Sequence, residues 1–572
     1  MSEHKPNNSK ELAKDILRTF GSLKAKRKPF EPLWRNVARF AGPMWFGWTG
    51  EPEHPQTREV EILDTEVRRA LTIYARGMLS GACGATSTWF GLEFEDPDFQ
   101  KWAQNRRSGQ AKAWLQKLEQ SYYTDLWNSG FYSEKETCYF NKGLFGWDSM
   151  YLDESVAGGL RFNSRPLHEC YIDRDYNDVV DRHFRAFSMT ARDMAEKWGR
   201  SNLPDEVRRA LDSRTTNGEE TSFKVVHAVF PRKDRSESLL RNNMAYASFY
   251  LLNEGEGQVI AEGGYEEMPY IVSRAYRLPG TPYCYSSGTE ALADVQMANE
   301  MKRLLLEAGQ LSVAPPYLVP DDGFIGRFSF KPRALNYYRK DSQGSAADFR
   351  PLELGGDPRF DLELFKATRE DINQPFHTDL FLSVQRRIAS GSTPTATEIT
   401  ELAGERMFLL TPLLVNEQVE SFTPTFARLF ALKMRRGELP PAPSDAQGRE
   451  FKAVYKSPLM RAQLEYRVNN ILSTYSQAAQ MVAMTGDTSI WENFDNHAAV
   501  RIVAEQRGFP QEALRELEDA MANMKAKAQA QAQSQNMQGI QQSLGDYSGL
   551  AKAPEDGSPA DLLMRSLRGG VQ

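Results

Sequence analysis

Residues 287–311 read SGTEALADVQMANEMKRLLLEAGQL, and this stretch decides how the rest of the chain is interpreted. Ser287 and Glu290 have the spacing of a capping box, which marks the start of a helix. Apolar side chains then recur every three or four residues along one stripe, at Leu292, Val295, Ala298, Met301, Leu305 and Ala308. The pattern predicts a helix of about 36 Å that stops before Pro315-Pro316, because proline cannot continue a helix.

A small group of strands and a second helix are predicted next. Apolar runs rich in aromatic and β-branched residues predict short strands at 317–319, 328–330, 335–338 and 349–354. Asp357-Pro358 then supplies an N-cap followed by a proline in the first helical position, and the helical spacing continues to Leu380 with a kink expected at Pro375. Two helices therefore bracket a small strand module.

A basic loop and a long third helix follow. Arg386 and Arg387 lie in a segment of glycine and small hydroxyl residues, and this pair can be either a solvated surface or a phosphate contact. Thr395 and Glu398 form another capping box, and the helix that they open is predicted to reach residue 436, with bends at two prolines, Pro412 and Pro424.

The chain on either side of this region divides into two further blocks. Residues up to about 286 mix helices with strands, including a hairpin around 171–180 and strands at 223–230, 245–252 and 270–276. Residues 440–443 are Pro-Pro-Ala-Pro, a short extended piece is predicted at 451–455, and everything after 458 is predicted to be helical, with a mobile tail beyond 542. The fold class predicted for the chain is α+β.

Composition excludes several classes of protein. The 572 residues allow three or four domains, and 70 Lys and Arg against 76 Asp and Glu give a net charge of −6, which argues against a generally basic nucleic-acid coat. The four cysteines are too far apart for any C-x-x-C motif, so a reducing compartment is expected. The N-terminus lacks an apolar signal core and no window is apolar enough for a membrane span, so neither export nor an integral membrane segment is expected.

Catalytic signatures for phosphate loops, dinucleotide turns, zinc helices and nucleophile elbows are absent from the sequence. Residues 173–178 copy the first ligand positions of a calcium loop, but the sixth position is Asp178 instead of Gly and the twelfth is Phe184 instead of Glu. An acidic hairpin turn is the preferred interpretation, and no metal, cofactor or catalytic residue is expected. The alternative is a metal-dependent nucleic-acid-processing enzyme, with Asp173, Asp175 and Asp178 as its only metal-binding candidates.

The order of these blocks, together with several short motifs, resembles the head-to-tail connector (portal) proteins of short-tailed phages. The motifs are residues 87–92 (STWFGL), 171–199, 285–294 (YSSGTEALAD), 314–323 (APPYLVPDDG), 395–399 (TATEI), 455–463 (YKSPLMRAQ) and 507–510 (RGFP). Each motif is weak alone, but they stand in the family's order over roughly residues 10 to 535.

The resemblance implies an elongated subunit of a ring. Its parts would be a wing (1–286), a first stem helix (287–311), a clip (312–356), a second stem helix (357–382), a tunnel loop (383–394), a long kinked wing helix with a return strand (395–457), a helical crown (458–510) and a C-terminal helix or barrel with a mobile tail (511–572). The tunnel-loop side chains expected to face DNA are Gln385, Arg386, Arg387, Ser390, Ser392 and Thr393.

The function implied by the resemblance is a dodecameric portal at one capsid vertex, through which double-stranded DNA is packaged and later ejected. The implied partners are other copies of the chain, DNA, the large terminase subunit, tail adaptor and tail proteins, and capsid and scaffolding proteins. The implied location is the head–tail junction of the virion, after synthesis in the host cytoplasm.

Overall fold

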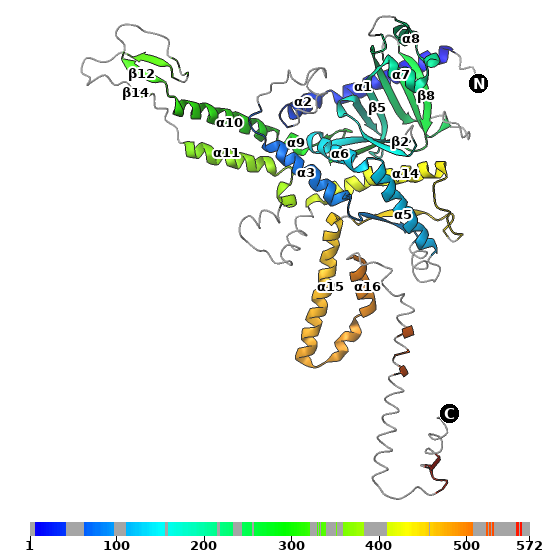
Figure 1. The fold of residues 1–572 in the computed structure, drawn as a ribbon. Helices are drawn as coiled ribbons and strands as arrows, with labels where there is room; N and C mark the ends of the chain where they lie inside the picture. Colours follow the sequence, from blue (N-terminus) through cyan, green and yellow to red (C-terminus); the bar gives the residue numbers. More distant parts are fainter. Residues whose placement is uncertain are drawn as a thin grey trace.

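Two helical hairpins project from a body of the predicted α+β class in the computed structural model, and one of them carries a small sheet at its tip (Figure 1). The structure describes residues 6–41, 62–96, 110–154, 158–213, 218–232, 243–253, 257–320, 358–382, 409–444, 446–456 and 458–506, with short pieces between 329 and 351 and beyond 522. Within these residues, no helix has both the length and the apolar character required to cross a membrane.

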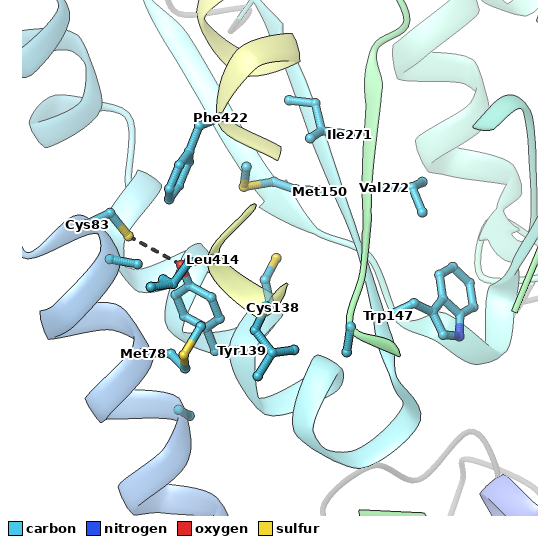
Figure 2. Packing of buried hydrophobic residues seen from close by; sticks show 14 of the residues in the cluster. Met78, Cys83, Cys138, Tyr139, Trp147, Met150, Ile271, Val272, Leu414 and Phe422 are labelled. Atoms are coloured by element: carbon cyan, nitrogen blue, oxygen red, sulfur yellow. Dashed lines mark hydrogen bonds between the residues drawn. The ribbon is translucent and has the colours of Figure 1, made fainter. Parts of the chain in front are cut away.

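The body is built around a three-stranded antiparallel sheet whose middle strand is β2, with β3 and β9 on its two sides (Trp147–Glu154, Leu160–Ser164 and Tyr270–Arg274). Four helices pack beside it: α2 (Glu31–Phe40), α3 (Glu66–Cys83), α5 (Gln110–Asn128) and α6 (Phe131–Phe145). Figure 2 shows Met78 of α3 and Tyr139 of α6 in one core with Leu414 and Phe422, so the long third helix completes this core.

All four cysteines of the chain are buried and unpaired. Cys83 and Cys138 lie in the core of the body, where Cys83 Sγ is 3.7 Å from the Tyr139 hydroxyl (Figure 2). Burial raises the thiol pKa of Cys83, Cys170 and Cys284 to about 12, and it also raises the pKa of Cys138. The thiols are therefore protonated at neutral pH.

A second sheet has five antiparallel strands in sequence order, β4 to β8 (Cys170–Arg174, Val180–Thr190, Ser222–Pro231, Tyr246–Leu252 and Gln258–Tyr265). The apolar side of α1 (Pro6–Arg27), with Ile16 and Phe20, packs on one face of this sheet. The opposite face packs against α7 (Ala191–Trp198) and α8 (Asp205–Asp212). The predicted β4–β5 hairpin is confirmed, whereas β8 was not predicted.

The first projecting hairpin consists of α9 (Ser287–Glu290), α10 (Leu292–Val313) and α11 (Pro358–Asn373). The sequence predicts Ser287 as the cap, but the structure uses Ser286, whose extended backbone lets its hydroxyl accept a bond from the Thr289 amide at 2.9 Å.

The predicted kink at Pro375 is a complete break: a turn occupies 374–377 and helix resumes at residue 378. At the tip, β12 (Tyr317–Pro320) pairs with β13 (Leu335–Tyr338) in parallel and with β14 (Arg350–Pro351) in antiparallel.

The third helix is described from residue 409 to Arg436 and contains a π-turn, Gln418–Phe422, before α14 (Thr423–Arg436). Pro424 has no N–H for the carbonyl of Glu420, and its ring would clash with that carbonyl in a regular helix. The wider π-turn directly before the proline relieves this conflict. The chain then returns as β15 (Phe451–Tyr455), which pairs antiparallel with β1 (Phe90–Phe94).

The remaining elements extend the body in two places. The second projecting hairpin is formed by α15 (Pro458–Thr485) and α16 (Asn496–Gln506), which confirms the predicted helical character for residues 458–506. The side chains of Tyr475, Trp491 and Phe494 form an aromatic cluster between the two helices. Short pieces complete the chain: β10 (Tyr276–Arg277), β11 (Cys284–Tyr285) and 3-10 turns at Leu167–Glu169, Arg200–Asn202 and Thr488–Asn493.

Candidate functional site

The hairpin of α10 and α11 projects away from the body in Figure 1, and its two helices lie side by side. Thr368 of α11 bonds the Met301 sulfur at 3.8 Å, and Lys302 lies over the Phe365 ring at 5.5 Å. The base of the hairpin is held to the body by polar contacts, since Arg369 Nη2 lies 2.8 Å from Asp64 Oδ2. The hairpin is therefore anchored to the body at its base.

Helix α10 exposes apolar side chains to solvent from its base to its tip. Met297, Leu304, Leu306 and Val313 are 43%, 52%, 48% and 89% exposed. Residues seven apart share a helix face, so Met297 and Leu304 form one stripe and Leu306 and Val313 form another. Since residues two apart are about 200° apart around a helix, the two stripes lie on nearly opposite sides. Such paired apolar surfaces are typical of interaction sites.

The small sheet at the tip is organised by one buried amide. Asn336 of β13 accepts a bond from the Ser329 amide at 2.5 Å and donates to the Ser329 carbonyl at 2.7 Å. These two bonds hold the chain before β13 against the strand. The sheet keeps an apolar side chain, Leu335, 52% exposed.

The six side chains predicted to face DNA lie outside the described residues, as does the predicted capping box of Thr395 and Glu398. They are Gln385, Arg386, Arg387, Ser390, Ser392 and Thr393. The predicted tunnel loop therefore stays a prediction. The structure describes the chain on both sides of it, up to Leu382 and again from Leu409.

The acidic turn between β4 and β5 is closed by protein contacts. Asp175 Oδ1 accepts bonds from the amides of Asn177 and Val179 at 2.8 and 2.9 Å, which is an Asx-type turn. Asp173 is paired with Lys26 at 2.8 Å, and Asp178 is bound by Arg174 and Arg274. The three carboxylates are thus engaged separately, and the described residues hold no group of three metal-binding side chains.

A cluster of buried charges, which the sequence interpretation missed, joins three parts of the body. Lys135 and Lys142 of α6 both bind Glu417, with Lys135 Nζ 2.5 Å from Glu417 Oε1, and Lys142 Nζ lies 3.3 Å from Asp148 Oδ2. Burial alone would raise the pKa of Glu417, but the two lysines outweigh it and lower that pKa to about 2. Burial lowers the pKa of Lys142, yet Glu417 and Asp148 raise it overall. The seven-residue spacing of the two lysines, on one helix face, was the available signal.

Comparison with known proteins identifies the family. The model of the family "Bacteriophage head to tail connecting protein" matches residues 13–514. The chain belongs to this family. It is 25% identical over 519 residues to the portal protein of Salmonella phage epsilon15, covering 89% of this chain and 90% of the relative. It is also 26% identical over 465 residues to the probable portal protein of Bordetella phage BPP-1, covering 80% of each.

The family membership gives the general function. The chain is a portal protein of a tailed phage, a head–tail connector that is located at the head–tail junction of the virion. It is a structural protein and not an enzyme, which removes the metal-dependent alternative. The separate engagement of Asp173, Asp175 and Asp178 is consistent with that outcome.

Proposed function

We propose that the chain assembles into a closed ring of twelve copies around a channel, through which double-stranded DNA is packaged and later ejected. The observation that supports the ring is the pair of exposed apolar stripes on α10, Met297 with Leu304 and Leu306 with Val313. A ring subunit meets its two neighbours through two different surfaces. A helix with apolar stripes on nearly opposite sides supplies one apolar surface for each neighbour.

A groove beside the second stripe gives further support. It has a volume of about 730 Å³ and is lined by Leu305, Leu306, Gly309, Gln310, Val313, Ala314 and Arg333. The groove is open and mostly apolar. Contact between its apolar surface and water is unfavourable in a free subunit, and a neighbouring subunit that covers the groove removes that contact.

The proposed division of the subunit follows the projecting elements. The stem is 287–311 and 357–382, the clip is 312–356, the wing is 1–286 with the long helix and return strand of 395–457, and the crown is 458–510. Residues 383–394 are the tunnel loop and 511–572 the C-terminal helix or barrel with its tail. The hairpin of α10 and α11, with its sheet at the tip, supports the stem and clip (Figure 1).

Charge supports a conduit that holds DNA weakly. Every phosphate that a protein neutralises adds to affinity, and strong affinity would oppose movement of DNA through a channel. Each copy carries a net charge of −6, so a ring of copies repels DNA as a whole. Arg386 and Arg387 would then supply the few local contacts.

The proposed partners follow from the position of the clip and the wing. The sheet of β12, β13 and β14 lies at the far end of the stem, where it is accessible to the large terminase subunit during packaging and to tail adaptor and tail proteins afterwards. The wing would contact capsid and scaffolding proteins.

Electron microscopy of the purified full chain tests the proposal. We expect rings with a central opening in end-on views, and class averages that give the subunit number. Subunits that stay monomeric at every protein and salt concentration would contradict the ring.

A further inference from the structure

The π-turn of the long helix carries one acidic side chain and follows directly after another, and each is held by two cations from other elements. Glu417, directly before the turn, is bound by Lys135 and Lys142 of α6. Glu420, inside the turn, is bound by Arg274 of β9, with Nη2 at 2.6 Å, and by Arg277, with Nη2 at 2.9 Å from the same carboxylate oxygen. The turn is thus fixed to the body by four cations.

Further hydrogen bonds tie the turn to α6 and β9, and tie these two elements to each other. Lys135 also donates to the Ser421 hydroxyl at 2.8 Å, and Lys142 donates to the Ser273 hydroxyl at 2.7 Å. The amide of Arg274 donates to Glu420 at 2.8 Å. Within five positions of the helix, three polar side chains are therefore held by α6 and by the end of β9.

Burial makes the Glu417 contacts hard to replace. The side chains of Glu417 and Lys135 are 0% exposed and that of Lys142 is 2% exposed. With Asp148, these groups form a neutral set of two lysines and two carboxylates. If the helix turned so that Glu417 left this set, two buried lysines would face a single carboxylate, which is strongly unfavourable. Such buried ionic groups can select one conformation among several.

We propose that Glu417 and Glu420 are positioning residues that hold the long helix in its π-turn, so that the turn does not depend on Pro424 alone. In the turn, the Thr423 amide bonds the Gln418 carbonyl, five residues back. A regular helix would shift each residue before the turn by about 100° around the axis relative to α14. Glu417 would then point away from Lys135 and Lys142.

The turn sets the direction of helix 409–417, which follows the proposed tunnel loop in the sequence. Glu417 and Glu420 thereby fix the direction in which the chain returns from the channel. This last step rests on the proposed function, whereas the role of the two glutamates in the turn does not.

The first test removes the proline and keeps the glutamates. We expect the structure of a Pro424→Ala variant of the full chain to retain the π-turn, with Glu417 still on Lys135 and Lys142. A regular helix through 418–422 in this variant would overturn the proposal, because the proline would then be the cause of the turn.

The second test removes one anchor without leaving an unpaired charge. The double variant Glu417→Gln with Lys142→Met leaves Lys135 and Asp148 in the cluster. Since these two charges are opposite, the cluster stays neutral and the variant can fold. We expect amide hydrogen exchange in 409–423 to become about tenfold faster, with little change in 427–436. Unchanged exchange in 409–423 would overturn the proposal.

A matched control breaks a buried ion pair elsewhere on the same helix. Lys433 of α14 binds Asp125 of α5, far from the turn, and its side chain is 4% exposed. Asp125→Asn should lower the melting temperature and leave exchange in 409–423 as in the natural chain. Faster exchange in 409–423 of this control would show a general loosening and would also overturn the proposal. Neither test needs a ring, so its failure is distinct from that of the proposed function.

Discussion

The imidazole of His183 stacks face to face on the Tyr270 ring, with the ring centroids 3.7 Å apart and the planes 8° from parallel. His183 belongs to the five-stranded sheet and Tyr270 to the sheet of β2, β3 and β9, so the stack joins these two sheets. A second histidine, His227, bonds the same tyrosine hydroxyl at 2.6 Å. The contact between the sheets thus depends on two buried imidazoles.

Acidification should weaken this contact. Burial lowers the pKa of His183 well below 6.5, with Arg185 and Arg165 adding to the effect, and burial with Lys197 lowers that of His227. The unfolded chain therefore binds more protons than the folded chain once the pH falls below about 6.5. Each histidine then removes about 1.4 kcal/mol of unfolding free energy per pH unit.

Melting curves between pH 7.5 and 5.5 measure this effect. We expect the melting temperature to fall across this range, and to fall less steeply in His227→Gln, which has lost one of the two titrating groups. A melting temperature that stays constant across the range in the natural chain would contradict the prediction.

A second prediction concerns the end of α6, where Gly146 has φ of +85°. A Cβ atom there would lie 2.6 Å from the Tyr285 carbonyl oxygen, whereas a Cβ at Gly130, with φ of +76°, would meet nothing within 4 Å. Gly130→Ala should cost only the backbone strain of about 1–2 kcal/mol, and Gly146→Ala about 1–3 kcal/mol more for the clash. Urea unfolding of both variants checks this, and equal losses would refute the role of the Tyr285 contact.

A third prediction concerns assembly through α10. Leu304 and Leu306 are about half exposed and stand on different stripes, so Leu304→Glu and Leu306→Glu should each leave the subunit folded. Each charge would be buried without a partner at a subunit contact, and rings should be lost. Gln296→Glu, at an exposed position of the same helix, is the control and should form rings. Rings in all three variants would exclude α10 from the subunit contact.

A fourth prediction concerns the tunnel loop. If Arg386 and Arg387 face the proposed channel, the double variant Arg386→Ala with Arg387→Ala should form normal rings but change the amount of DNA that is packaged or retained, because it would make fewer phosphate contacts. The DNA content of particles measures this. Failure of the rings themselves would assign the two arginines to a subunit interface instead.

The helices and strands with regular apolar spacing could be predicted from the sequence. The stripe from Leu292 to Ala308 predicts α10, and two short extended pieces on either side of a turn at Asn177-Asp178 predict the β4–β5 hairpin, because each pattern is local. The cap was misassigned by one residue, since Ser286 and Ser287 both have a suitable partner three positions on. Only the backbone geometry distinguishes them.

Contacts between distant segments could not be predicted in the same way. The pairing of Phe90 with Tyr455 and the binding of Glu417 by Lys135 join residues far apart in the sequence. No local spacing specifies either partner. The strand β8 was missed because its sequence, QVIAEGGY, has two glycines before its last residue and lacks a sustained apolar alternation.

The four buried cysteines have a practical consequence. Their protonated thiols are poor nucleophiles, since the thiolate is the reactive form, and none is accessible at the surface. A single cysteine introduced at an exposed stem position would therefore be the one thiol that maleimide reagents label rapidly. Fluorescent or cross-linking probes could then report on neighbouring copies without removing any natural cysteine from the chain.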